Sequence, residues 1–192
     1  MREIAPGIRH WTARHLNIGA EVSSYWLPDL GVLIDPLSVP EEVSGVETIV
    51  LTNRHHRRSS LDAREVFGAT VHVPRAGMHD WEGDPVEPYE PGDTLAGGAV
   101  KAYEVGSICP DESALHIPSV SALAVADGVV RYEESLRFVS DDLMDDPDDT
   151  KRGLKEAYAR LADELEFENL LVAHGQPLAG EAREALRAFA TA

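Results

Sequence analysis

The first third of the chain alternates short apolar runs with polar turns, in the pattern of a β-rich segment. Residues 22–27 and 31–34 are apolar runs rich in β-branched and aromatic side chains. Each predicts a strand, and the Pro-Asp-Leu between them predicts a hairpin turn. Residues 47–52 form a continuous apolar run, which is typical of a strand buried on both faces. A strongly polar segment, residues 53–60, follows this strand directly.

The pattern then changes from strand to helix and back to strand. Ser60 can cap a helix over residues 61–67, Gly68 ends it, and residues 70–73 predict the next strand. The order strand, loop, helix, strand is that of an α/β unit containing a parallel pair of strands.

The second half again mixes strands and helices, so we expect two similar halves that meet near residue 105 within a single domain covering residues 1–192. The strong turn dipeptide Asp127-Gly128 separates two predicted strands. Residues 141–149 hold six aspartates in nine positions and are interpreted as a solvated loop. The predicted strands cover residues 100–105, 120–126, 129–132 and 169–173, and the predicted helices cover residues 151–165 and 181–189.

Charge narrows the classes of partner. The 192 residues include 34 Asp plus Glu against 17 Lys plus Arg, which gives a formal net charge of -17. This charge argues against a nucleic-acid binder and against attachment to an anionic membrane. The sequence has no 18-residue apolar run and no signal-peptide pattern at residue 1, and its one cysteine, Cys109, allows neither an internal disulfide nor a cysteine zinc cluster. We therefore expect a cytoplasmic protein in which Cys109 is an inert, partly buried thiol rather than a nucleophile.

Three of the eight histidines follow buried strands. His55 and His56 come after the strand at residues 47–52, and His174 comes after the strand at residues 169–173. Because ligands of open α/β sheets bind beyond the carboxyl ends of the strands, these side chains are candidates for a site. The alternative is that each is an ordinary hydrogen-bonded histidine at the surface or its boundary.

Five segments, in their order and spacing, resemble the metallo-β-lactamase fold superfamily. They are SSYWLPDLGVLIDP, TIVLTNRHHRRSS, ATVHVPRAGMHD, SICPDESALHIPSVSALAVADG and LLVAHGQP. The resemblance implies an αββα sandwich, that is, two mixed sheets flanked by helices. It also implies a hydrolase in which one or two metal ions, usually zinc, lower the pKa of bound water for attack on an ester, thioester, amide or phosphoester.

The resemblance implies that most of the family's metal ligands are replaced. The H-x-H-x-D-H loop of the family corresponds to residues 53–58, so that only its second histidine is matched, by His55. The remaining ligand positions correspond to Glu112, Asp127 and His174. A set of one or two histidines with carboxylates would suit manganese or iron at least as well as zinc.

Arginines in the loop argue against a second metal ion. Arg57 and Arg58 bring positive charge to the second metal position and cannot donate a lone pair. A salt bridge from either arginine to Asp127 would take the place of the metal. The sequence therefore predicts either no metal or one divalent metal ion. A shifted site in which His56 and His79 join His55 is a further alternative.

Two functions follow from these residues. In the first, the chain is a divergent hydrolase of a small anionic ester, thioester or phosphoester, with His55, Asp127 and His174 as catalytic residues. In the second, it is a non-catalytic relative that binds a small anion or a protein partner in the same pocket. In both, Arg57 and Arg58 bind the anion, since residues 54–58 are the densest basic cluster of an acidic chain. The substrate and the oligomeric state are left open.

Overall fold

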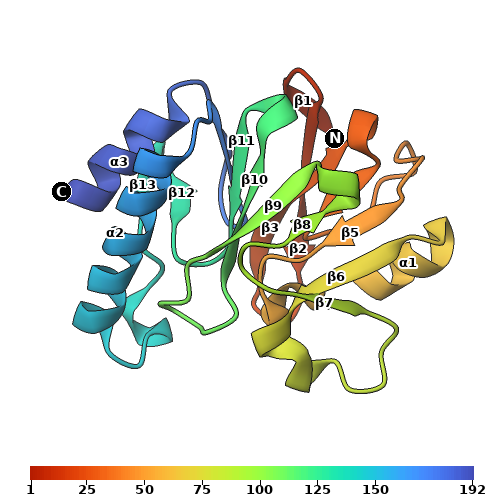
Figure 1. Cartoon of the computed structure of the whole chain (residues 1–192), viewed down its shortest axis with the longest axis horizontal. Helices are drawn as coiled ribbons and strands as arrows, with labels where there is room; N and C mark the ends of the chain where they lie inside the picture. The colour runs from red at the N-terminus through yellow and green to blue at the C-terminus, as the bar shows by residue number, and fades with distance from the viewer.

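Three clusters of buried apolar side chains separate four layers of secondary structure in the computed structural model, which describes residues 1–192 (Figure 1). The central cluster lies between two β-sheets and includes Tyr25, Val50, Leu115 and Leu171. A second cluster joins one sheet to helices α2 and α3, and the third joins the other sheet to α1. The layers therefore follow the order αββα, as the sequence predicted.

The first sheet has seven strands in chain order, β1-β2-β3-β4-β5-β6-β7. Strands β1 to β4 are antiparallel, and the pairs from β4 to β7 are parallel. The short strand β5 is buried throughout, in agreement with its continuous apolar run. The strands are β1 (Arg2–Ala5), β2 (Ile8–His15), β3 (Ala20–Leu27), β4 (Val32–Ile34), β5 (Thr48–Val50), β6 (Thr70–Pro74) and β7 (Glu87–Tyr89).

The second sheet has six strands in the order β15-β14-β11-β10-β9-β8, and only its pair β11 and β14 is parallel. Its strands are β8 (Thr94–Leu95), β9 (Val100–Glu104), β10 (Ser113–Ile117), β11 (Ala122–Val125), β14 (Asn169–Val172) and β15 (Leu178–Ala179). Two further strands, β12 (Val130–Tyr132) and β13 (Ser135–Arg137), form a separate hairpin. The first sheet ends at residue 89 and the second begins at residue 94, which is earlier in the chain than the division predicted near residue 105.

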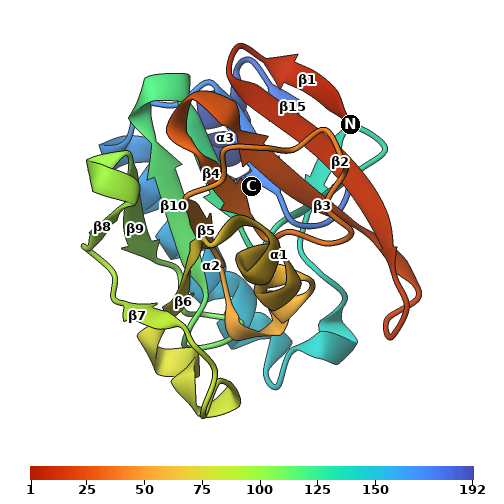
Figure 2. The same cartoon turned by 90° about the vertical axis from the view of Figure 1, so that its right-hand side faces the viewer.

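Three helices cover the outer faces of the sheets. Helix α1 (Ser60–Phe67) lies on the first sheet, in front of it in Figure 2, and α2 (Pro147–Glu164) packs with α3 (Ala182–Thr191) on the second. None of the three combines the length and the apolar character needed to cross a membrane. Six 3-10 turns complete the structure: η1 (Pro28–Leu30), η2 (Arg54–Arg57), η3 (Arg75–Asp80), η4 (Ala96–Gly98), η5 (Pro118–Val120) and η6 (Asp141–Leu143).

Asp127 and Gly128 form a turn between β11 and β12, as the sequence predicted, although these two strands do not pair with each other. Gly128 is also required by close packing, since a Cβ there would lie 2.6 Å from the Tyr158 hydroxyl. One sequence interpretation was wrong, because the aspartate-rich segment is not all loop. Asp146 caps α2 by accepting a hydrogen bond from the Asp149 amide, because a carboxylate favours the positive end of a helix.

Candidate functional site

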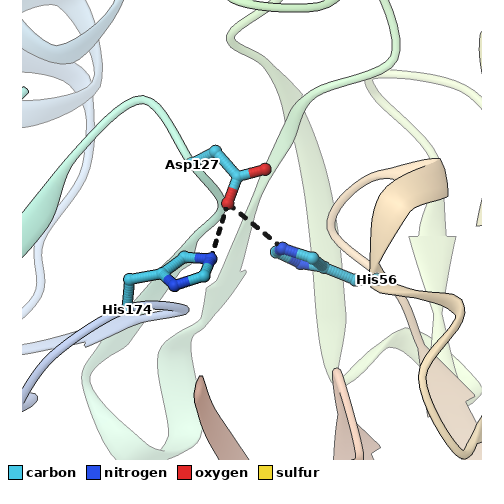
Figure 3. Close-up of side chains that lie close together, drawn as sticks. All are labelled: His56, Asp127 and His174. Atoms are coloured by element: carbon cyan, nitrogen blue, oxygen red, sulfur yellow. Dashed lines mark hydrogen bonds and ion pairs between the residues drawn. The ribbon is translucent and has the colours of Figure 1, made fainter. Parts of the chain in front are cut away.

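His56, Asp127 and His174 meet where the two sheets come together (Figure 3). The Nε2 atom of His174 lies 3.0 Å from Asp127 Oδ1, and the Nε2 atom of His56 lies 3.2 Å from the same oxygen. One ligand atom from each residue lies within 4.8 Å of the other two. His56 is buried, whereas Asp127 and His174 remain partly open to solvent. The three side chains therefore present their polar atoms to one small volume.

Strand register explains why Asp127 and His174 are neighbours. Val125 of β11 pairs with Val172 of β14 in a parallel ladder, and each site residue follows its paired valine by two positions. Parallel strands end at the same edge of a sheet, so equal offsets bring the two side chains together. The first sheet is tied to this edge by hydrogen bonds from the Ser23 amide to the Ala173 carbonyl and from the Ser113 amide to the Thr52 carbonyl, 2.8 and 2.9 Å long.

Asp35 orients the ring of His56. Its Oδ2 atom lies 2.9 Å from His56 Nδ1 and accepts a 2.6 Å hydrogen bond from the Thr52 hydroxyl, while the Thr52 amide donates to Oδ1 over 2.9 Å. Holding Nδ1 in this way aims Nε2 at Asp127, and a carboxylate in this position is the usual support of a metal-binding histidine. Asp35 was not among the residues predicted from the sequence, although it belongs to the Ile-Asp-Pro that ends the first of the five segments resembling the family.

Asn53 holds two of the three residues, Asp127 and His56. Its side-chain amide donates to Asp127 Oδ2 over 2.9 Å, and its oxygen accepts from the backbone amide of His56 over 3.1 Å. The first contact leaves Oδ1 of Asp127 facing the histidines. The second forms the N-terminal cap of the turn η2, which places His56 on the inner side of the loop.

Charges on both sides decide the protonation of His56. Burial and the nearby Arg58 cation favour the neutral ring, but the carboxylates of Asp35 and Asp127 outweigh them and raise the pKa of His56 to about 9. Burial also opposes ionisation of Asp127, yet His56 and the hydrogen bond from His174 hold its pKa well below the ordinary value. In the metal-free protein near pH 7, His56 is therefore a cation between two carboxylates.

Glu112, the remaining carboxylate predicted from the sequence, is buried and contacts the backbone next to Asp127. Its buried Oε1 accepts hydrogen bonds from the Gly128 amide, 2.8 Å away, and from the Tyr158 hydroxyl, 3.4 Å away, while Oε2 has no partner. Burial and the negative charge of Asp127 raise the pKa of Glu112 to about 8. Glu112 is not among the three converging side chains.

Of the two loop arginines predicted to bind an anion, Arg58 lines the pocket and Arg57 does not. Arg57 points away from the site, with Nη1 2.6 Å from Asp84 Oδ2 and its guanidinium over the Trp81 ring. Arg58 uses Nη1 to donate to the backbone carbonyls of Ser23 and Asp35, over 2.7 and 2.8 Å. Neither arginine pairs with Asp127, so the predicted salt bridge is absent. Its place is taken by His56 and His174.

The histidines also divide differently from the sequence hypothesis. His55 was assigned to the metal position, but η2 turns its neighbour His56 inward and leaves His55 exposed at the edge of the same pocket. His79 is exposed in η3, where it lies 3.7 Å from Asp80, and it is not part of the group. Of the shifted site considered from the sequence, only His56 joins the converging side chains.

A pocket of about 860 Å³ opens over this group. It is also lined by His55, Arg58 and Cys109. Burial, with Asp111 and Glu112 nearby, raises the pKa of the Cys109 thiol, which therefore stays protonated and is a poor nucleophile.

The donor set fits one metal ion. Two imidazole nitrogens and a carboxylate oxygen suit zinc, iron or manganese, and the hydrogen bond that Nδ1 of His56 donates to Asp35 leaves Nε2 as the ligand atom. No second group of three or more His, Cys, Asp or Glu side chains converges in the chain. A two-metal site does not fit these residues.

Comparisons with known proteins identify the fold. No family model and no curated protein match the sequence. The structure is similar to rubredoxin:oxygen oxidoreductase from Desulfovibrio gigas, with a TM-score of 0.68, 15% identity and coverage of 99% of this chain, although the chain spans only 61% of that protein. It is also similar to DIM-1 metallo-β-lactamase, with a TM-score of 0.72, 13% identity and coverage of 98% of this chain and 95% of that one. A metallo-β-lactamase family protein from Thermus thermophilus gives a TM-score of 0.68 at 17% identity, over 98% of this chain and 80% of that one. The resemblance drawn from the ordered sequence segments is thereby confirmed: the chain has the fold of the metallo-β-lactamase superfamily.

Proposed function

We propose that this chain is a hydrolase in which His56, Asp127 and His174 hold a single divalent metal ion beside the pocket. The observation that carries the proposal is the convergence of two Nε2 atoms and one carboxylate oxygen within 4.8 Å of one another. The fold shared with metallo-β-lactamases supports it. The substrates we propose are esters, thioesters or phosphoesters.

The surrounding residues support a metal-binding role. Asp35 keeps the proton of His56 on Nδ1 and so directs Nε2 into the group, and Asn53 holds the second oxygen of Asp127. A bound metal ion would supply Lewis acidity and lower the pKa of water. His55 lines the pocket without joining the group, which makes it available for proton transfer to a leaving group.

A second function, binding without catalysis, is favoured by one specific observation. His56 lies 2.9 Å from Asp35 and 3.2 Å from Asp127, so a protonated ring satisfies both carboxylates without any metal. In that state the pocket would bind a ligand but lack the means to activate water.

Metal content distinguishes the two functions. Tag-free protein would be incubated with zinc, manganese or anaerobic iron(II), desalted and measured by elemental analysis. We expect about one equivalent of metal in the wild type and almost none in His56→Ala or His174→Ala. His55→Ala is the matched control, because it removes the adjacent, exposed histidine and should retain the metal. A wild-type content below about a tenth of an equivalent would refute the metal site.

Turnover is tested on the same preparations. Model esters, thioesters and phosphodiesters would be screened with metal-loaded wild type and with His56→Ala. We expect turnover that depends on both the metal and His56. Metal binding without any turnover would favour the non-catalytic alternative.

A further inference from the structure

The charge of the pocket is opposite to that of the chain. The protein has 34 acidic and 17 basic side chains, yet Asp127 is the only acidic residue among the 18 that line the pocket. The same lining includes Arg58, His15, His55 and Arg137, whose Nη2 also lies 2.7 Å from Glu133 Oε2. An acidic protein with a single carboxylate in one pocket repels anions elsewhere and accepts them there.

Two polar atoms of the lining residues lack a partner within the chain. Nη2 of Arg58 and Nδ1 of His15 are buried and make no hydrogen bond. Arg58 is also bound only to neutral carbonyl groups, with no carboxylate at hydrogen-bonding distance of its guanidinium. The carboxylates of Asp35 and Asp127 act on this cation from a distance without pairing with it, so Nη2 can still donate to an anionic ligand at the pocket wall.

Most of the pocket wall is nevertheless apolar. Ten of the 18 lining residues are hydrophobic. Ile18 lies in the loop between β2 and β3, and Leu143 lies in η6, much later in the chain. Both are unusually exposed for such side chains, at 59% and 63%, so the pocket leaves apolar surface in contact with water. Covering that surface requires a ligand with an apolar part of its own.

From these features we infer that the pocket binds an anion that carries an apolar chain or ring, such as a medium-chain carboxylate, which is also the product of hydrolysing the corresponding acyl ester. This goes beyond the small anion expected from the sequence, because a pocket of about 860 Å³ has room for a drug-sized molecule. The inference rests on the proposed function only for the ester; binding of the free carboxylate needs no metal and no turnover.

A homologous series of ligands tests the inference. Calorimetric titrations of chelator-treated wild-type protein would compare straight-chain carboxylates from butyrate to decanoate with the primary alcohols and amines of the same lengths. We expect the dissociation constant to fall about fourfold for each added CH₂ group. We also expect each carboxylate to bind about tenfold more tightly than its alcohol, and the amines to bind most weakly. Affinity that is independent of chain length, or equal for carboxylates and alcohols, would overturn the inference.

Matched variants test the location. Ile18→Ser and Leu143→Ser should flatten the dependence on chain length, because they remove apolar surface at the pocket mouth. Leu16→Ser is the control, since Leu16 lies in the same loop, is 86% exposed and does not line the pocket. Arg137→Gln should reduce the preference for carboxylates, whereas Arg152→Gln, remote from the pocket, should not. An equal effect of Leu16→Ser and Ile18→Ser would indicate general adsorption and overturn the assignment.

The outcomes separate this inference from the proposed function. The titrations are made without metal, so a failure of the ligand series leaves the metal measurement unaffected. Conversely, a wild type without metal that still binds carboxylates in the expected order would refute the hydrolase and retain the ligand class.

Discussion

Ionisation of Glu112 opposes folding, and replacing this residue with glutamine should reveal the effect as a change in the pH dependence of stability. The carboxyl group is buried, and its Oε1 already accepts hydrogen bonds from Gly128 and Tyr158. Glutamine retains an oxygen for these two donors and cannot ionise. The substitution therefore removes the titration while it changes the local packing very little.

The pKa shift gives the sign and the magnitude. Burial and then Asp127 raise the pKa of Glu112 from 4.5 to about 8. The folded protein thus holds this proton more tightly than the unfolded chain does, and stability falls as the pH rises from 4.5 to about 8. Each unit of pH within that window costs about 1.4 kcal/mol, so between about pH 5.5 and pH 7 the free energy of unfolding should fall by roughly 2 kcal/mol.

Urea denaturation at these two pH values measures the effect. The wild type should lose roughly 2 kcal/mol more than Glu112→Gln over the interval, so the difference between the two proteins isolates Glu112 from every other titrating group. Glu156→Gln, at an exposed position of α2, is the control and should follow the wild type. Parallel pH profiles for Glu112→Gln and wild type would show that Glu112 is already ionised in the folded protein, and the reasoning would fail.

Four further results are expected. A metal ion must displace the proton from Nε2 of His56, whose pKa is raised to about 9. The apparent metal affinity should therefore increase by up to about tenfold per pH unit between about pH 6.5 and 8.5. Equilibrium titrations measure this, and an affinity that does not change with pH would contradict it. Gly175→Ala should destabilise the protein by about 2–4 kcal/mol in chemical denaturation, because its Cβ would lie 1.9 Å from the Arg131 carbonyl oxygen, whereas Gly180→Ala, with a similar φ but open space, should cost only about 1 kcal/mol. Burial, and then the charges of Arg2 and the N-terminus, lower the pKa of His10 to about 4, so stability should fall by up to about 1.4 kcal/mol per unit as the pH drops from 6.5 toward 4, and His10→Gln should lose this slope. Cys109 should resist alkylation at neutral pH until the protein is unfolded, and rapid labelling of the native protein would refute the raised pKa of its thiol.

The sequence by itself determined the elements and much of their order. A continuous apolar run located the strand at residues 22–27, and a capping serine and a terminal glycine located the helix after Ser60, because these are local properties of the chain. The buried strand before His174 made this histidine a candidate, and the family resemblance added Asp127. Strands with weaker patterns were missed, among them β1 and β10.

Only the tertiary structure decided which side chains face the site. His55 and His56 are adjacent and identical in type, and the resemblance to the H-x-H-x-D-H loop favoured His55. The inward residue is His56 because Asp35 and Asp127, which lie 21 and 71 residues away in the chain, are brought to its two ring nitrogens by different sheets. The direction of a side chain in a loop depends on such distant partners, and no local pattern records them.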